Sequence, residues 1–228
     1  MLTLAEKFLL LMIDDETGKM APGSSTVLPY GLAGAIIIDL SLKGCLDYKD
    51  KKVFFLDKEN AGDPILTNML GYLKSKGTSR KLNYLVQKLG YEISRKKISE
   101  SFINRLVEKE ILQMDEVQYL FFFTKKVYPS NNTGTENEIR SNIRQLILEE
   151  NSQHDEESIA LIGLLKACNL DKSLFSKEEY KLAKKKITKI MKEIPYGKAV
   201  NEAIMAMQSA VMASIIAATA ATTSTSGG

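Results

Sequence analysis

The sequence predicts a mostly helical fold, in which several helices form a bundle around one central apolar helix and one or two small β-hairpins are attached. Apolar residues recur at helical spacing along most of the 228 residues. One segment, 29–43, is apolar on nearly every face and suits the centre of a bundle. Only two places carry the short β-branched and aromatic runs expected of hairpins. We therefore expect one helical domain over residues 1–221 and a low-complexity, disordered tail over 222–228.

Local signals define the elements of the first half of the chain. Thr3 and Glu6 form a capping box that starts the first helix, whose apolar run continues to Ile13. A small, polar loop follows, and Pro29 suits the first turn of the second helix, which Gly44 ends. The further elements expected here are a hairpin of segments 46–48 and 53–56, and helices starting at Pro64 and spanning 79–89 and 98–110.

The strongest hairpin signal of the chain lies in its second half, in segments 111–114 and 119–123, with the acidic pair 115–116 between the two predicted strands. Ser176 and Glu179 form a second capping box, which predicts a helix start. The helices expected in this half span 136–149, 156–170, 177–192 and 199–221.

The composition excludes several function classes. The 31 basic residues barely exceed the 28 acidic ones, and a net charge of +3 is too small for a dedicated nucleic-acid binder. Cys45 and Cys168 are far apart in the sequence, so we expect both thiols to be reduced and to fill space in the apolar core, as in a protein of a reducing compartment.

No cleavable signal sequence is visible, which predicts a cytoplasmic protein. The uncharged, alanine-rich segment 203–221 is predicted to be a buried helix rather than a membrane span.

No pattern indicates an enzyme or a metal site. The single histidine, His154, lies in a polar run with no nucleophile placed by a motif. Gly31 and Gly34 lie inside an apolar helix rather than in a phosphate-binding turn. The acidic run 14–16 lacks the spacing of a calcium loop and is interpreted as a helix-terminating turn. We expect no catalytic residue, no metal ligand and no cofactor.

A basic cluster, residues 95–97, is the first feature that a plain globular domain does not require. We expect it just before or within the first turn of the helix over 98–110, with Arg80 and Lys81 upstream. Because cations at a helix start oppose the macrodipole, an outside partner is expected. Phosphate fits, since helix-start amides and lysine can bind it together. An ordinary solvated charge run is the alternative.

An aromatic run is the second such feature. If it forms a strand, its side chains alternate between faces, and at least two large apolar groups point outward unless both faces are covered. Two lysines follow the run, which fits insertion into a bilayer interface or contact between two copies; a covering helix is the alternative. Together the two features would supply about 4 to 8 kcal/mol, or about millimolar to micromolar affinity. The run consists of Tyr119, Leu120, Phe121, Phe122 and Phe123.

Four segments carry a family resemblance: 2–11, 31–40, 104–109, and 120–122 with the following 128–129. In order and spacing they resemble the Golgi phosphoprotein family, over nearly the whole chain to about residue 217. The resemblance implies a mostly helical domain that binds phosphatidylinositol 4-phosphate and inserts a hydrophobic hairpin into the membrane. Eukaryotic members also act as adaptors that retain glycosyltransferases in the Golgi through the vesicle coat. No basic extension precedes residue 1, so a prokaryotic-type or reduced member is expected.

The resemblance also implies where a lipid head group binds. In eukaryotic members it contacts a tryptophan before the second helix, an arginine in the Gly-Leu-x-Gly segment, and two arginines three residues apart. The corresponding positions here are Ser24 and Ser25, Ala33, Lys96 and Ser99, of which only Lys96 is charged. The phosphoinositide site that the resemblance implies consists of Ser24, Ser25, Arg95, Lys96, Lys97 and Ser99.

Two functional hypotheses follow. The leading one is a peripheral membrane protein that binds a phosphoinositide or another anionic lipid on the cytoplasmic face of a membrane, as an adaptor for membrane-protein tails. Its partners are anionic head groups and the membrane surface, with no nucleic acid. The alternative is a soluble, self-associating scaffold with no lipid role, in which the aromatic hairpin joins copies of the chain into a homo-oligomer and the basic cluster binds acidic protein tails.

Overall fold

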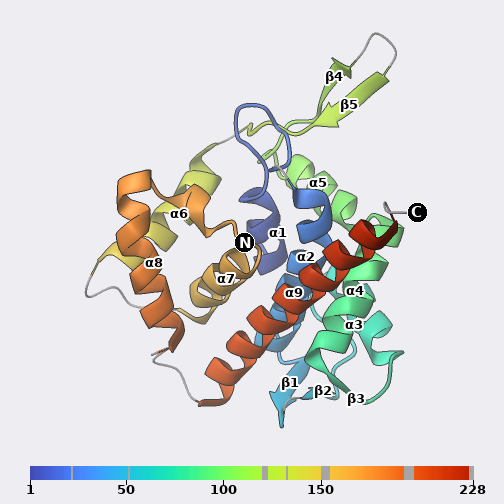
Figure 1. Cartoon of the computed structure of the whole chain (residues 1–228). Coiled ribbons are helices and arrows are strands. Elements are labelled where there is room, and N and C mark those ends of the chain that lie inside the picture. The colour runs from blue at the N-terminus through green and yellow to red at the C-terminus, as the bar shows by residue number, and fades with distance from the viewer. Residues whose placement is uncertain are drawn as a thin grey trace.

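The computed structural model of the chain describes residues 1–21, 23–50, 52–119, 123–131, 133–149, 155–192 and 198–225. The protein is mostly helical with small antiparallel strand pairs, which confirms the predicted fold class (Figure 1). Its elements are α1 (Leu4–Leu10), α2 (Ser24–Leu42), β1 (Leu46–Lys49), β2 (Lys52–Phe55), α3 (Pro64–Lys74), β3 (Ser79–Lys81), α4 (Leu82–Lys96), α5 (Ile98–Glu108), β4 (Asp115–Tyr119), β5 (Phe123–Val127), α6 (Thr133–Leu148), α7 (Glu156–Ala167), the 3-10 turn η1 (Asp171–Leu174), α8 (Lys177–Lys192) and α9 (Lys198–Thr225).

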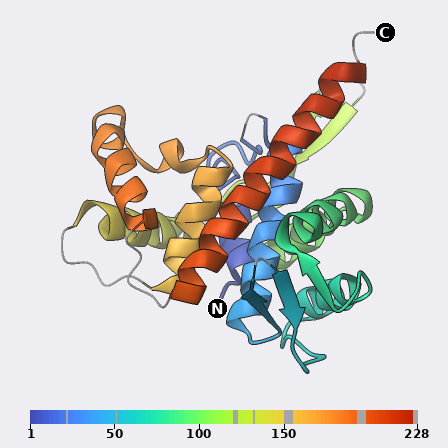
Figure 2. The same cartoon turned by 60° about the horizontal axis from the view of Figure 1, so that its bottom comes forward.

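The centre of the fold is α2. Every residue from Gly31 to Leu40 is buried, and α1, α4, α7 and α9 pack around this helix. Figure 2 shows α9 lying obliquely across α2 and α7. Among the described residues α2 is long and apolar enough to span a bilayer, but half of the segment is buried inside the fold, as in a core helix. The apolar composition of this segment thus identified the middle of the bundle.

The start of α1 is fixed by side chains of two helices. The Thr3 hydroxyl accepts a hydrogen bond from the Glu6 amide at 3.2 Å, and the Glu6 carboxylate accepts one from the Thr3 amide at 2.8 Å, which confirms the capping box. Asp39 of α2 accepts from the amides of Leu4 and Ala5, at 2.9 and 3.0 Å. The first-turn amides of α1 are therefore satisfied without water.

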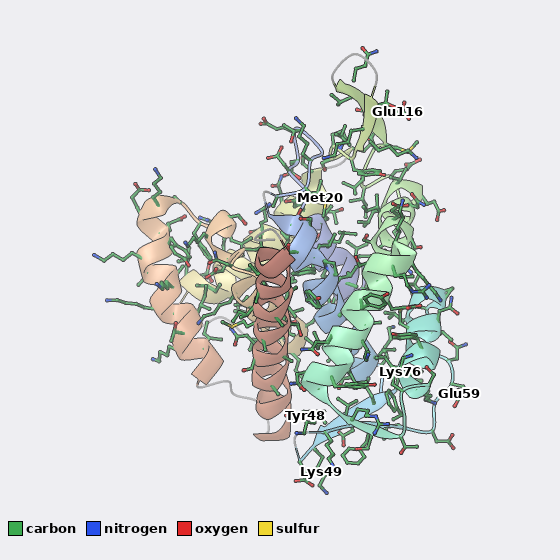
Figure 3. All side chains as sticks on the ribbon, turned by 45° about the vertical axis from the view of Figure 1, so that its right-hand side comes forward. Met20, Tyr48, Lys49, Glu59, Lys76 and Glu116 are labelled. Carbon is green, nitrogen blue, oxygen red and sulfur yellow. The ribbon has the colours of Figure 1, made fainter. Side chains whose placement is uncertain are left out.

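The two β-structures lie at opposite ends of the helical body (Figure 1). β1, β2 and β3 form an antiparallel sheet in that order, and β4 pairs with β5 in a separate ribbon. In Figure 3, Tyr48 and Lys49 of β1 lie at one end and Glu116 of β4 at the other. These ends are called the sheet end and the hairpin end.

Two helices differ from the predictions. α2 begins at Ser24, so Pro29 lies in its second turn rather than its first. The predicted helix over 79–89 is instead strand β3 followed by α4, and α4 continues through residues 90–94, which lie between the two helices predicted over 79–89 and 98–110. The buried face of α4 explains the continuation, because Leu85, Leu89 and Ile93 keep helical spacing across Gly90.

The predicted register of the second hairpin is wrong. The acidic pair 115–116 lies inside β4 rather than between two strands, and of the aromatic run the structure describes only its ends, Tyr119 as the last residue of β4 and Phe123 as the first of β5. Beyond its root, where Val127 is buried, the ribbon projects away from the core and has no apolar surface to pack against, so its paired residues are mostly polar. Glu116 lies directly opposite Lys126, an opposite-charge pair that favours this register.

The C-terminal elements agree more closely. α8 spans the predicted residues, and its capping box is confirmed by Ser176 and Glu179, whose reciprocal amide bonds measure 2.9 and 3.2 Å. α7 ends at Ala167, three residues early, and a short 3-10 turn follows. α9 continues to Thr225, four residues into the segment predicted as a tail, while 226–228 lie outside the described residues.

A candidate anion-binding site at the hairpin end

Two antiparallel helices bring the predicted lipid-site residues to one end of the molecule. α2 ends near β1 and α4 starts directly after β3 of the same sheet, so the two helices run in opposite directions. They touch where Gly90 faces Tyr30: a Cβ on Gly90 would lie 2.5 Å from Tyr30 Cδ1. Lys96 comes six residues after Gly90, and Ser24 six residues before Tyr30. At about 1.5 Å per residue, both lie about 9 Å beyond the contact, toward the hairpin end.

The first turn of α2 contributes helix-start amides to this site. Its N-cap, Gly23, has a left-handed conformation with φ of 76° and supplies no side-chain cap. Ser24 is half-buried and Ser25 exposed, and both belong to the first helical turn rather than to the predicted loop. The start of a 19-residue helix carries partial positive charge on its amides. The Ser24 amide already donates to the Ala21 carbonyl at 3.1 Å, so an anion here could be bound by the amides that follow it in the first turn and by the two serine hydroxyls.

Arg95 and Lys96 lie in the last turn of α4, not at a helix start. The macrodipole argument made from the sequence is therefore wrong for these two residues, because cations are favoured at a helix C-terminus. Both pair with Glu92 of the same helix, each at 2.9 Å. The hydrogen bond from Lys96 does most to hold the pKa of the buried Glu92 below its usual value, and Arg95 adds to it. Two cations thus share one carboxylate.

Lys97 and Ser99 occupy the junction between α4 and α5. Lys97 has a φ of 52° and serves both as the C-cap of α4 and as the N-cap of α5. Its side chain is 73% exposed and its Nζ lies 3.4 Å from Glu100, so it stays accessible to solvent. Ser99 is half-buried in the first turn of α5. Lys97 is the basic residue whose position agrees with the helix-start argument.

Two other groups of residues fall outside the site. Ala33, at the position of an arginine in eukaryotic members, is fully buried in α2 and cannot reach a head group. Arg80 and Lys81 belong to β3, at the opposite end of α4. A helix of 15 residues is about 22 Å long, so these two cations do not join the basic cluster.

One tight loop, 14–21, connects α1 to the start of α2 and also holds the root of the hairpin. The Tyr128 amide donates to the Gly18 carbonyl at 2.8 Å. Gly18 has a φ of +63°, and a Cβ there would lie only 2.2 Å from Pro129 N, so only glycine fits. In Figure 3, Met20 of this loop lies at the base of the hairpin. The hairpin root and the start of α2 are therefore tied to the same few residues.

The two strands of the hairpin are joined through the aromatic run of the sequence. β4 ends at Tyr119 and β5 begins at Phe123, and the ribbon projects beyond the helices (Figures 1 and 3). The predictions for Leu120, Phe121 and Phe122 lie outside the described residues, as do those for the side chains of Tyr119 and Phe123. The lysines that follow, Lys125 and Lys126, are exposed on β5.

The described part of the chain contains no group of three or more histidine, cysteine, aspartate or glutamate side chains that could hold a metal ion. His154 lies outside it. Both cysteines are buried and unbonded, and burial raises the pKa of Cys168 to about 12, so its thiol stays protonated. A Cβ on Gly31 would lie 2.9 Å from Cys168 Sγ, which shows that this thiol fills space against α2.

Sequence reasoning missed Glu92, which determines how much positive charge the basic cluster presents. Glu92 precedes Arg95 by three residues and Lys96 by four, the spacing at which helical side chains meet. That signal was present in the sequence. Because the predicted helices end at 89 and start again at 98, Glu92 fell between them, where this spacing has no such meaning.

Comparison with protein families gives one match. A family model described as Golgi phosphoprotein 3 matches residues 4–207 of the chain. The matched region runs from the start of α1 into α9 and includes the hairpin, the start of α2 and the α4–α5 junction. No curated protein matches the chain.

Proposed function

The chain belongs to the Golgi phosphoprotein family, and on that premise we propose that it is a peripheral membrane protein that binds phosphatidylinositol 4-phosphate or another anionic lipid. It would act on the cytoplasmic face of a membrane, as an adaptor for the tails of membrane proteins and not as an enzyme. In a eukaryotic cell that membrane would be the Golgi.

The observation that supports the proposal is that the groups proposed to bind an anion and the projecting hairpin lie at the same end of the molecule. Lys96 ends α4 and Lys97 follows as its C-cap, and α2 begins at Ser24, at the same end of the α2–α4 pair. α5 continues from this junction toward the root of the hairpin (Figure 1). One planar surface can therefore meet the basic residues and the ribbon together.

The charges favour a general anionic surface over strict head-group recognition. Arg95, Lys96 and Lys97 face two carboxylates, those of Glu92 and Glu100. Ala33 is buried at the position where eukaryotic members have a head-group arginine. Few fixed cations therefore remain to distinguish one phosphorylated head group from another. About 1 kcal/mol for each lysine and about 1.5 to 3 kcal/mol for each inserted aromatic group would give weak, reversible binding.

Vesicle co-sedimentation tests the proposal. Vesicles of phosphatidylcholine alone are compared with vesicles that also contain phosphatidylserine or phosphatidylinositol 4-phosphate. The protein should sediment with the anionic vesicles only, and the double variant Lys96→Glu, Lys97→Glu should bind at least about thirtyfold more weakly, because two attractive charges of about 1 kcal/mol each are lost and become repulsive. Phe122→Asp should weaken binding by a similar factor, because a charged group resists insertion.

A matched control is the double variant Lys184→Glu, Lys185→Glu on α8. Both lysines are exposed, and α8 lies far from the hairpin (Figure 1). Equal losses in the two double variants would mean that only the total charge matters, which contradicts a defined site. If light scattering shows that Phe122→Asp dissociates an oligomer while lipid binding is unchanged, the scaffold hypothesis replaces this proposal.

A further inference from the structure

The outward face of α4 carries a row of basic and aromatic side chains. Its four members on the helix follow one another at intervals of four, three and four residues, which place them on one face of α4. Arg80 of β3 joins them because its guanidinium lies over the Tyr84 ring. All five are exposed, and two are large aromatic groups: Tyr84 is 37% and Tyr91 64% accessible. We call this set the α4 row; it consists of Arg80, Tyr84, Lys88, Tyr91 and Arg95.

Contacts among these side chains order the row in advance. The Arg80 guanidinium lies 6.0 Å and the Lys88 ammonium 5.6 Å from the centre of the Tyr84 ring, within cation–π distance. Next to them, Lys76 lies 4.2 Å from the centre of the Tyr72 ring, whose hydroxyl donates to the Lys88 carbonyl at 3.1 Å. The rings and cations are therefore held beside one another with their outer sides in solvent.

The charge of this region calls for an anionic partner. Residues 64–99 contain eight lysines and arginines and a single acidic residue, Glu92, a net charge of +7 in a chain whose total is +3. Glu92 is buried and already paired with Arg95 and Lys96. Within the described residues, neither Arg80 nor Lys88 has a carboxylate at ion-pair distance. Positive charge along the row is thus left uncompensated by the protein.

The direction of the row decides between a membrane and a polypeptide. α4 runs from the sheet end toward the hairpin end, which is the direction in which the ribbon projects (Figures 1 and 3). A membrane that meets the hairpin would reach only the Arg95 end of the row. The rest, over about 20 Å, would extend away from the bilayer. A linear partner of about seven extended residues matches that length.

We propose that the α4 row binds an extended acidic segment of a partner protein. Carboxylates of the segment pair with Arg80 and Lys88, and its apolar side chains pack on the rings of Tyr84 and Tyr91. This site lies beside the proposed lipid site and goes beyond it, because it gives the membrane-bound protein a surface for a second, acidic ligand.

Fluorescence anisotropy of a labelled ten-residue peptide of glutamate and leucine tests the proposal on the full chain. A peptide with glutamine in place of glutamate is the ligand control. Lys88→Glu should weaken binding of the acidic peptide about tenfold, and Tyr91→Ala about fivefold, since an exposed ring supplies packing without holding the fold. Lys185→Glu on α8 makes the same charge change elsewhere and should weaken binding less than twofold.

Three results would overturn the proposal: equal losses for Lys88→Glu and Lys185→Glu, equal affinity for the glutamine peptide, or displacement of the acidic peptide by anionic vesicles. The last would show that the row is part of the membrane-facing surface. Vesicle-bound protein should instead still bind the peptide. A protein that binds the peptide through Lys88 but ignores all vesicles would refute the proposed lipid function and leave this inference standing.

Discussion

Glu6 and Glu136 are both buried, and each lies within ion-pair distance of an arginine, yet their pKa values move in opposite directions. Glu6 is fully buried at the start of α1 and accepts hydrogen bonds from Arg105 at 2.9 Å and Lys109 at 2.7 Å. Burial alone would raise the pKa of Glu6. The bonds from Lys109 and the Thr3 amide, with the nearby charge of Arg105, outweigh burial and lower it.

Glu136, in the first turn of α6, has a carboxyl group as its second neighbour. It is 1% exposed and accepts from Arg140 at 2.6 Å. Burial, and then a hydrogen bond with Asp15 of the loop that holds the hairpin, raise the pKa of Glu136 to about 8. Asp15 Oδ1 and Glu136 Oε2 are both buried, and neither accepts a hydrogen bond from a donor group among the described residues. Two carboxyl groups can bond in this way only while one of them keeps its proton.

The charge of the second neighbouring group thus decides whether a buried glutamate beside an arginine is ionised. In the core, α1 and α5 are joined by a charged cluster with cations on two sides of one carboxylate. At the hairpin root, the loop and α6 are joined by a carboxyl pair that depends on a proton. The stability of the first junction should therefore not change with pH near neutrality, whereas the stability of the second junction should.

Removing the arginine of the charged cluster should have the largest effect. Arg105 also pairs with Asp63, the N-cap of α3, so Arg105→Leu leaves two carboxylates without this partner. Removing one partner of a buried ion pair lowers the free energy of unfolding by about 3 to 5 kcal/mol. Urea unfolding should show a loss of this size. A loss below about 1 kcal/mol would mean that the cluster contributes no more than a surface pair does.

Glu136→Gln should change how stability depends on pH. Because the folded-state pKa of about 8 exceeds the ordinary 4.5, the wild-type protein is stabilised below pH 4.5 and loses that stability as pH rises to 8. Asp39, whose pKa burial raises to about 6, adds to this loss only at lower pH. Between pH 6 and 8 the wild type should therefore lose about 2 to 3 kcal/mol, and the variant almost none. Parallel curves for the two proteins would contradict the proton-dependent pair.

Gly18→Ala should loosen the same junction without changing any charge. The left-handed φ and the close contact with Pro129 together predict a loss of about 1 to 3 kcal/mol. Hydrogen exchange should show faster exchange of the Tyr128 amide, while amides of α2 between residues 31 and 40 stay protected. Unchanged exchange at Tyr128 would show that the loop does not hold the hairpin root.

Lys7→Gln should have the smallest effect. Lys7 directly follows Glu6, but its ion pair with Glu157 is partly exposed, with 24% and 32% of the two side chains accessible. Such a pair contributes about 0.5 kcal/mol. Thermal unfolding in low and high salt should show a small difference that salt removes. A loss comparable to that of Arg105→Leu would erase the distinction between the two sites.

Local signals were enough to predict much of the fold, because they act within a few residues. The capping boxes at Thr3 and Ser176 and the apolar second helix are signals of this kind. The hairpin register was not predictable from apolarity, since a projecting ribbon is paired through polar residues. The contacts of Glu6 with Arg105 and of Glu136 with Asp15 join residues about a hundred positions apart, and no spacing rule connects such residues.

The Gly18 loop has one more consequence. Because the same short segment carries both the hairpin root and the chain entering α2, the ribbon cannot tilt without pulling on the first turn of that helix. If the proposed lipid site is correct, occupancy at either place would alter the free energy of occupancy at the other, and by thermodynamic reciprocity the two changes would be equal. Insertion of the tip and capture of an anion would accordingly be cooperative events rather than additive ones.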